Sequence, residues 1–211
     1  MKKQTVMVLF GGRSPEHGIS LQSAATVLEN LDTEKYRPVA VGITREGRWY
    51  RFTGSWDAIR EDRWSQGACT PAILSPDREH HGLLLLDGAG WWRVRVDVIF
   101  PALHGKNGED GAVQGLAQLA GIPWVGCGVA SSAVCMDKAL TKTILTAAGI
   151  PNAAWFPVVR EDRQDGAIAA AVDQRLGWPV FVKPARAGSS VGVSRAENAA
   201  GLSAALDTAF R

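Results

Sequence analysis

Apolar and polar residues alternate along the first 43 positions in blocks that fit strands joined by a helix. Residues 6–10 form a continuous apolar run that ends in two glycines, which is typical of a buried parallel strand. Leu21, Ala24, Ala25 and Leu28 then share one helical face. Residues 36–43 follow as a second strand. Strand, helix and strand without a tight hairpin predict a βαβ unit.

Residues 44–95 show a different pattern, of short strands and tight turns. Residues 44–51 predict a hairpin that turns at Glu46 and Gly47, and residues 83–94 predict a second hairpin. A short helix is expected around residues 56–63. Trp49, Trp91 and Trp92 fall in strand-like stretches, and we interpret them as packing residues.

The rest of the chain predicts further α/β structure. Strands are expected at 96–103, 122–125, 155–159, 179–182 and 191–194, and helices at 112–120, 136–148, 165–176 and 198–210. Gly149 and Pro151 end the helix 136–148 and mark a candidate domain boundary.

The segment richest in chemical groups is the loop 104–111, HGKNGEDG, between an expected strand and an expected helix. Ligands bind at this edge of open α/β sheets, and glycines let the backbone approach them closely. A simpler interpretation is a polar turn in which Asp110 caps the helix. Spacing alone leaves both interpretations open.

Composition excludes some classes of protein. The 211 residues are 46% apolar and 21% charged with a net charge of +2, which is ordinary for a soluble globular protein and gives no argument for nucleic-acid or membrane binding. No apolar run approaches the ~20 residues that span a bilayer, so we expect a cytoplasmic protein. Cys127 and Cys135 are expected in the core as reduced thiols. His80 and His81 fit solvated loop residues better than a metal pair.

Three classes of function suit an α/β chain of this kind: an oxidoreductase, a ligase and a non-catalytic binding module. The glycines do not form GxGxxG, which disfavours a Rossmann-type oxidoreductase. A ligase and a non-catalytic nucleotide- or ligand-binding α/β module both remain.

Four motifs in the same order carry a family resemblance. They are GGRSPEHGIS at 11–20, HGKNGEDGAVQG at 104–115, MDK at 136–138 and VKPARAGSSVG at 182–192. Together they resemble the D-alanine–D-alanine ligase family of ATP-grasp enzymes. The segments 42–54, 125–127 and 135–138 resemble the branch that includes the D-alanine–D-serine ligases of vancomycin resistance.

The resemblance implies a fold and a reaction. It implies an amino-terminal Rossmann-like (pre-ATP-grasp) domain at 1–136 with a hairpin insertion at about 44–95. A central α+β ATP-grasp subdomain follows at 137–211, and the carboxyl-terminal subdomain is absent, so the sequence looks like an amino-terminal fragment. The implied reaction joins two D-amino acids through an acyl phosphate for peptidoglycan precursors, in a protein that is a homodimer at full length.

Glu16, Ser20 and His104 are the candidate substrate-binding residues. Glu16 follows the first strand, and the resemblance implies that it binds the ammonium of the first D-alanine; the alternative is a glutamate favoured by the helix dipole. We expect Ser20 to be the helix N-cap and to join the same pocket. The resemblance places His104 beside the first substrate.

Lys138 and Lys183 are the candidate ATP-binding lysines. Lys138 opens a helix, and Lys183 ends an apolar strand, where a buried cation needs an anion partner. The resemblance implies that Gly188, Ser189 and Ser190 cover the ATP phosphates and that Ser189, as a catalytic residue, hydrogen-bonds to Glu16. The family's Mg²⁺ ligands lie later in its chain, so no metal ligand is assigned and the fragment is expected to be inactive.

Overall fold

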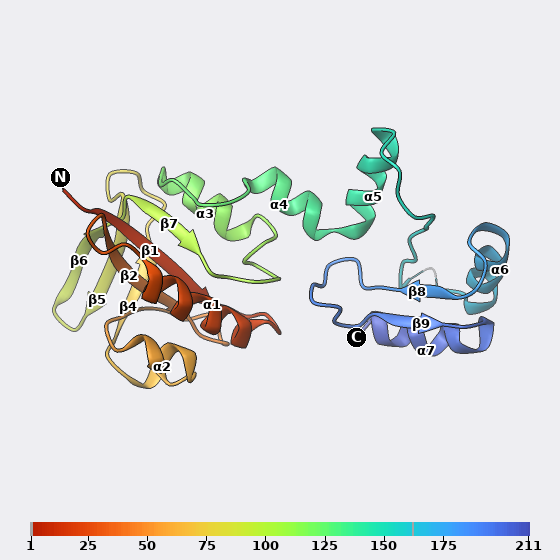
Figure 1. Cartoon of the computed structure of the whole chain (residues 1–211), viewed down its shortest axis with the longest axis horizontal. Helices are drawn as coiled ribbons and strands as arrows, with labels where there is room; N and C mark the ends of the chain where they lie inside the picture. Colours follow the sequence, from red (N-terminus) through yellow and green to blue (C-terminus); the bar gives the residue numbers. More distant parts are fainter. Residues whose placement is uncertain (1, 162) are drawn as a thin grey trace. The chain divides into compact units, whose positions relative to one another are not determined.

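The computed structural model describes residues 2–161 and 163–211, and the chain divides into two compact units, Met1–Ala133 and Val134–Arg211 (Figure 1). The division falls before the helix that Gly149 ends, and not at the candidate boundary of Gly149 and Pro151. Every helix within the described residues is too short or too polar to cross a membrane.

The first unit is built on a seven-stranded mixed sheet with the order β6-β5-β4-β3-β2-β1-β7. Its strands are β1 (Gln4–Gly11), β2 (Tyr36–Ile43), β3 (Trp49–Phe52), β4 (Cys69–Leu74), β5 (Gly82–Asp87), β6 (Gly90–Arg95) and β7 (Val98–Pro101). β1 pairs in parallel with β2 and β7, and the other pairs are antiparallel. Helix α1 (His17–Asn30) joins β1 to β2, which confirms the predicted βαβ unit.

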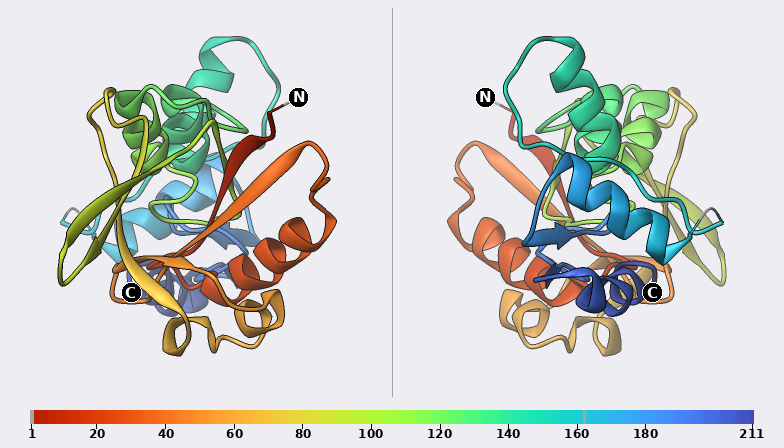
Figure 2. Two further views of the ribbon diagram at one scale, coloured as in Figure 1. Left: turned by 90° about the vertical axis from the view of Figure 1, so that its left-hand side faces the viewer. Right: turned by 90° about the vertical axis from the view of Figure 1, so that its right-hand side faces the viewer.

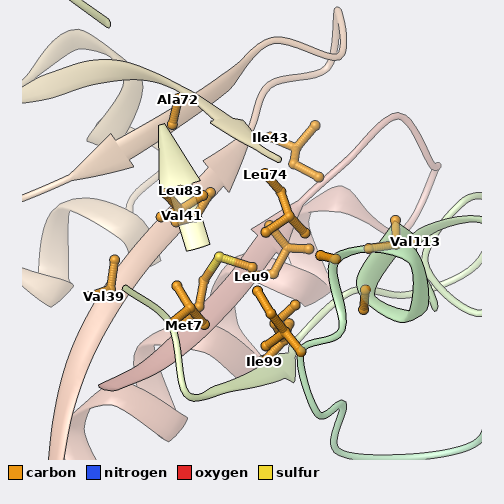
Figure 3. Packing of buried hydrophobic residues seen from close by; sticks show 14 of the residues in the cluster. Met7, Leu9, Val39, Val41, Ile43, Ala72, Leu74, Leu83, Ile99 and Val113 are labelled. Carbon is orange, nitrogen blue, oxygen red and sulfur yellow. The ribbon is translucent and has the colours of Figure 1, made fainter. Parts of the chain in front are cut away.

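Strand β1 is buried on both faces, as its continuous apolar run predicts. Val6, Val8 and Phe10 pack with α1, helix α2 (Trp56–Arg60) and the 3₁₀ turn η1 (Trp64–Gln66). The alternate residues Met7 and Leu9 pack with helix α3 (Ala112–Ala120) on the other face (Figure 3). Figure 2 shows α1 and α2 on one side of the sheet and α3 on the other. The alternation along one strand therefore sets two cores.

The insertion forms the antiparallel half of the sheet. Both predicted hairpins are present, as β2–β3 and β5–β6, but β4 was not predicted. Trp49 is half-buried against the core as expected. Trp91 and Trp92 are 58% and 41% exposed, so the packing interpretation is wrong for them. Their strand β6 ends the sheet, and no described element covers its exposed face.

The segment 122–138 differs from expectation. Residues 122–125 contribute one isolated bridge, Ile99 to Trp124, rather than a strand. The expected helix 136–148 is present as α5 (Lys138–Ala147), and a helix that was not predicted, α4 (Val129–Met136), precedes it. They are separated at Asp137, whose side chain caps α5 by accepting hydrogen bonds from two backbone N–H groups. Cys127 and Cys135 are exposed, so their expected core position is wrong.

The second unit contains α5 and a small α/β layer. The layer comprises α6 (Asp165–Arg175), β8 (Val180–Val182), β9 (Ser194–Ala196) and α7 (Ala199–Ala209). β8 and β9 pair antiparallel, with Val182 opposite Ser194, so the hairpin partner begins at Ser194 rather than at residue 191. Val172, Val180, Ala196 and Ala205 form its core. Residues 155–159 are not a strand, because no described strand pairs with them.

Candidate active site

Glu16 stands at the carboxyl edge of β1, directly before α1. It is the N-cap residue of α1, but its side chain makes no capping hydrogen bond there. The carboxylate instead lies against the loop 104–111: a Cβ built on Gly105 would lie 2.1 Å from Glu16 Oε2. Gly105 has a φ of +67°, which a glycine adopts without steric cost. The structure thus brings together the two motifs that the sequence analysis singled out.

Ser14 holds this junction together. Its hydroxyl donates to the carbonyl of His104 at 2.8 Å and accepts from the Glu16 N–H at 3.1 Å. The backbone before α1 is therefore fastened to the loop that follows β7. These two hydrogen bonds fix Glu16 directly before α1.

Ser20 is not the N-cap that we expected, because α1 begins at His17. The Ser20 side chain is fully buried. Its hydroxyl accepts from the Gly11 N–H at 2.7 Å and donates to the Ala102 carbonyl. Ser20 therefore joins the ends of β1 and β7, since it satisfies one polar backbone group from each.

His104 is half-buried, and its ring is directed to α1. Its Nε2 lies 3.1 Å from Ser23 Oγ in that helix. His17, which the sequence analysis did not single out, is also buried, with Nδ1 2.8 Å from the Gly12 carbonyl. Its position directly after Glu16 in the first motif was the available signal.

The acidic residues of the loop accept hydrogen bonds from backbone N–H groups in and next to the same loop. Glu109 accepts from the Gly105 N–H at 2.7 Å, and Asp110 accepts from Asn107 at 2.8 Å and from Ala112 at 3.1 Å. The simpler interpretation of Asp110 is thus correct in part, since it binds the first N–H of α3. With both carboxylates held by backbone amides, the loop keeps a fixed shape.

Lys138 opens α5, as predicted, and is bound to the loop after β8. Its backbone N–H donates to Ala185 O at 3.0 Å, and its Nζ donates to Ala187 O. The neighbouring Asp137 accepts from Arg186 Nε at 2.8 Å. That hydrogen bond is the main cause that lowers the pKa of Asp137. The pair spans 49 residues, and no sequence pattern indicated it.

Lys183 follows β8 but is exposed, so the argument from a buried cation is wrong. β8 has only three residues and lies in a two-stranded sheet, which leaves its end open to solvent. Lys183 Nζ lies 5.9 Å from the centre of the Phe181 ring.

Gly188, Ser189 and Ser190 form the exposed turn that follows. The carbonyls of Gly188 and Ser190 accept from Val191 at 2.9 Å and Val193 at 3.2 Å. Ser189 and Ser190 both have positive φ, at 46° and 59°, which is unusual for residues with a side chain. Such backbone is found where loops wrap a ligand.

No group of three or more His, Cys, Asp or Glu side chains among the described residues could hold a metal ion. His80 hydrogen-bonds instead through Nδ1 to Ser75 Oγ at 2.7 Å.

These features are typical of an α/β domain that binds a ligand, with the candidate site at the carboxyl ends of β1 and β7. The unit that follows has lysines around a glycine–serine loop. The model for the D-ala D-ala ligase N-terminus matches residues 5–127, and the model for the D-ala D-ala ligase C-terminus matches residues 144–211. The chain belongs to the D-alanine–D-alanine ligase family.

Individual relatives support this family assignment. The chain is 44% identical to a D-alanine–D-alanine ligase of Caldicellulosiruptor bescii and 43% identical to the vancomycin/teicoplanin A-type resistance protein VanA of Enterococcus faecium. It covers 58% and 57% of these relatives, which in turn match 100% and 99% of it. The crystal structure of the VanG D-Ala:D-Ser ligase from Enterococcus faecalis matches 99% of the chain, with a TM-score of 0.86 and 40% identity over 60% of its own length. The chain thus spans less than two thirds of its relatives.

Proposed function

We propose that this chain supplies the first-substrate and nucleotide-binding parts of an ATP-dependent ligase that joins D-alanine to a second D-amino acid. The observation that carries the proposal is the carboxylate of Glu16 against Gly105, at the edge of the sheet where ligands of α/β proteins bind. Family membership supports it, because the relatives include a D-alanine–D-alanine ligase and a D-Ala:D-Ser ligase.

The first substrate needs a partner for its ammonium group. Glu16 provides a carboxylate at this position, and this carboxylate makes no capping hydrogen bond to α1. Charge-assisted hydrogen bonds of this kind are roughly twice as strong as neutral ones. His104 and Ser20 complete the environment: His104 is held by Ser23, and Ser20 fixes the strand ends beneath. In this proposal Glu16 contacts the substrate, His104 lies beside it, and Ser20 positions the backbone.

The nucleotide site belongs to the second unit. Its donor set fits a polyphosphate: Lys138 held on the loop, Lys183 exposed, and Gly188, Ser189 and Ser190 in a tight turn. ATP supplies the phosphoryl group that activates the carboxylate of the first D-alanine for attack by the second amine. The lysines and the loop N–H groups offset the negative charge that gathers there.

Mg²⁺ does not fit the described residues, since they offer no cluster of three ligating side chains. Because phosphoryl transfer of this kind relies on metal ions to offset charge, the 211-residue chain alone should show no ligase activity. The assay is ATP-dependent phosphate release with D-alanine and Mg²⁺. Release at the rate of a protein of its relatives' length would refute this part of the proposal.

The main test is Glu16→Gln in a protein of the relatives' length that carries these residues. We expect kcat/KM for the first D-alanine to fall at least ~10-fold, since a charge pair becomes a neutral contact. Glu34→Gln, an exposed glutamate at a distance from the loop in sequence, removes the same charge and should leave kcat/KM unchanged. Equal kcat/KM values for the two variants would show that Glu16 does not contact the substrate. A non-catalytic module would release no phosphate in any of these proteins.

A further inference from the structure

The first unit contains a hollow that borders the proposed substrate site, since His104 is among its lining residues, but that does not include Glu16. It has a volume of about 230 Å³ and opens at the carboxyl ends of β1, β2 and β7. Its buried lining is apolar, from Ile43, Leu103 and Val113. Trp49 adds a half-buried aromatic side chain, and Arg13 and Lys106 are exposed at its rim.

This hollow, the α3-side pocket, lies on the opposite face of the sheet from Glu16. Ile43, Leu103 and Val113 belong to the core cluster that packs on α3, in which Figure 3 labels Ile43 and Val113. Glu16 is the N-cap residue of α1, which covers the other face. Glu16 is not among the residues that line the pocket. The two sites are therefore adjacent but distinct, since His104 and its loop border both.

The charges around the pocket have one sign. Arg13 and Lys106 line it, and no lining residue is acidic. Within residues 2–161 and 163–211, neither cation makes a hydrogen bond or an ion pair. Two acids close to lining residues are engaged elsewhere: Glu109 accepts from the Gly105 N–H, and Glu46, which precedes the lining residue Gly47, hydrogen-bonds with Thr44, which lowers the Glu46 pKa. Two unpaired cations beside an apolar floor attract an anion and can be desolvated by it.

We propose that the α3-side pocket binds a small organic anion, with an apolar body on Ile43, Leu103, Val113 and Trp49 and a carboxylate or phosphate ester between Arg13 and Lys106. The volume limits the ligand to a small one, because pockets for drug-sized ligands measure ~300–1,000 Å³. An apolar body alone gives little selectivity, whereas an arginine paired with a lysine selects an anionic head group. The proposal does not depend on the ligase reaction.

The test uses the 211-residue chain and three probes of similar size: benzoate, phenyl phosphate and neutral benzamide. Binding is followed in amide NMR spectra by the indole N–H signal of Trp49, which is assigned by its loss in Trp49→Phe. We expect benzoate or phenyl phosphate to shift this signal, and the stronger of the two identifies the head group. Benzamide should bind at least ~10-fold more weakly. Equal binding of benzamide, or no shift with any probe, would overturn the proposal.

Variants then test the two cations. Arg13→Ala and Lys106→Ala should each weaken binding of the anionic probe ~10-fold. Arg48→Ala, on the same hairpin but outside the lining, should change it less than twofold and controls for the general field. Glu16→Gln should leave binding intact, so failure here is distinct from failure of the proposed function. Inorganic phosphate that binds as tightly as phenyl phosphate would contradict the apolar half of the site.

Discussion

Gly105→Ala tests whether the loop 104–111 holds the Glu16 carboxylate in place. The new Cβ would lie 2.1 Å from Glu16 Oε2, whereas ordinary contact begins near 3.4 Å, so the carboxylate must move by about 1.3 Å. A misplacement of ~1 Å in a substrate-positioning group can cost ~100-fold. We expect kcat/KM for D-alanine to fall ~10- to 100-fold in a protein of the relatives' length.

The strain of the backbone must be separated from the clash. Gly149 has almost the same conformation, with φ of +69° against +67° for Gly105, and a Cβ there meets nothing within 4 Å. Both alanine variants should lose ~1–2 kcal/mol of stability from the left-handed backbone, measured by thermal unfolding. Only Gly105→Ala should change the kinetics.

A double-mutant cycle makes the comparison strict. If Gly105→Ala acts through Glu16, it should cost much less in the Glu16→Gln background, because the displaced charge is already gone. Equal costs in both backgrounds, or equal kinetics for Gly105→Ala and Gly149→Ala, would refute the reasoning.

Three further outcomes are expected. Ser20→Ala leaves two buried backbone groups without their partner, and should lower the stability of the chain by ~1–3 kcal/mol in chemical denaturation; a change within error would show that other groups replace the hydroxyl. The Asp137 pKa lies below its ordinary 3.8 in the folded state, so the stability from Arg186 is complete above pH 3.8 and is lost as the pH falls below it. Arg186→Ala should flatten that loss of stability, by less than about 1 kcal/mol because Arg186 is 79% exposed, and an unchanged acid-unfolding curve would contradict the pair. Lys183→Ala should weaken ATP binding in calorimetry without lowering the Tm, since this exposed side chain packs little; the reverse result would indicate a structural lysine.

The strands and helices that the sequence predicted well are those with complete local patterns. β2 has the predicted bounds, and α1 follows from apolar residues at helical spacing. β4 was missed because Thr70 and Pro71 interrupt its apolar character; it becomes a strand through pairing with β3 and β5. Residues 155–159 show the opposite case, in which a strand-like pattern has no partner strand. Pairing, which the local sequence does not contain, decides both.

The candidate site shows the same limit more sharply. The sequence correctly predicted that Glu16, His104 and Lys138 lie at the ends of strands or helices, because loops after strands and before helices follow from local patterns. What each side chain contacts depends on which strands are neighbours. Ser20 shows this: as a hydroxyl near a helix start it predicts an N-cap, but β7 beside β1 brings Ala102 within reach, 82 residues away.

Strand order therefore turns separate motifs into a site. β1 lies between β2 and β7, so the loop after β1 meets the loop after β7, which is distant in sequence, as well as the loop after β2. On the α1 face this meeting sets Glu16 against Gly105, and on the α3 face it places Arg13 beside Lys106 around a shared hollow. Glycine is needed at position 105 because the carboxylate occupies the space of a side chain. A single loop, held rigid by Glu109 and Asp110, thus forms one wall of two chemically different sites.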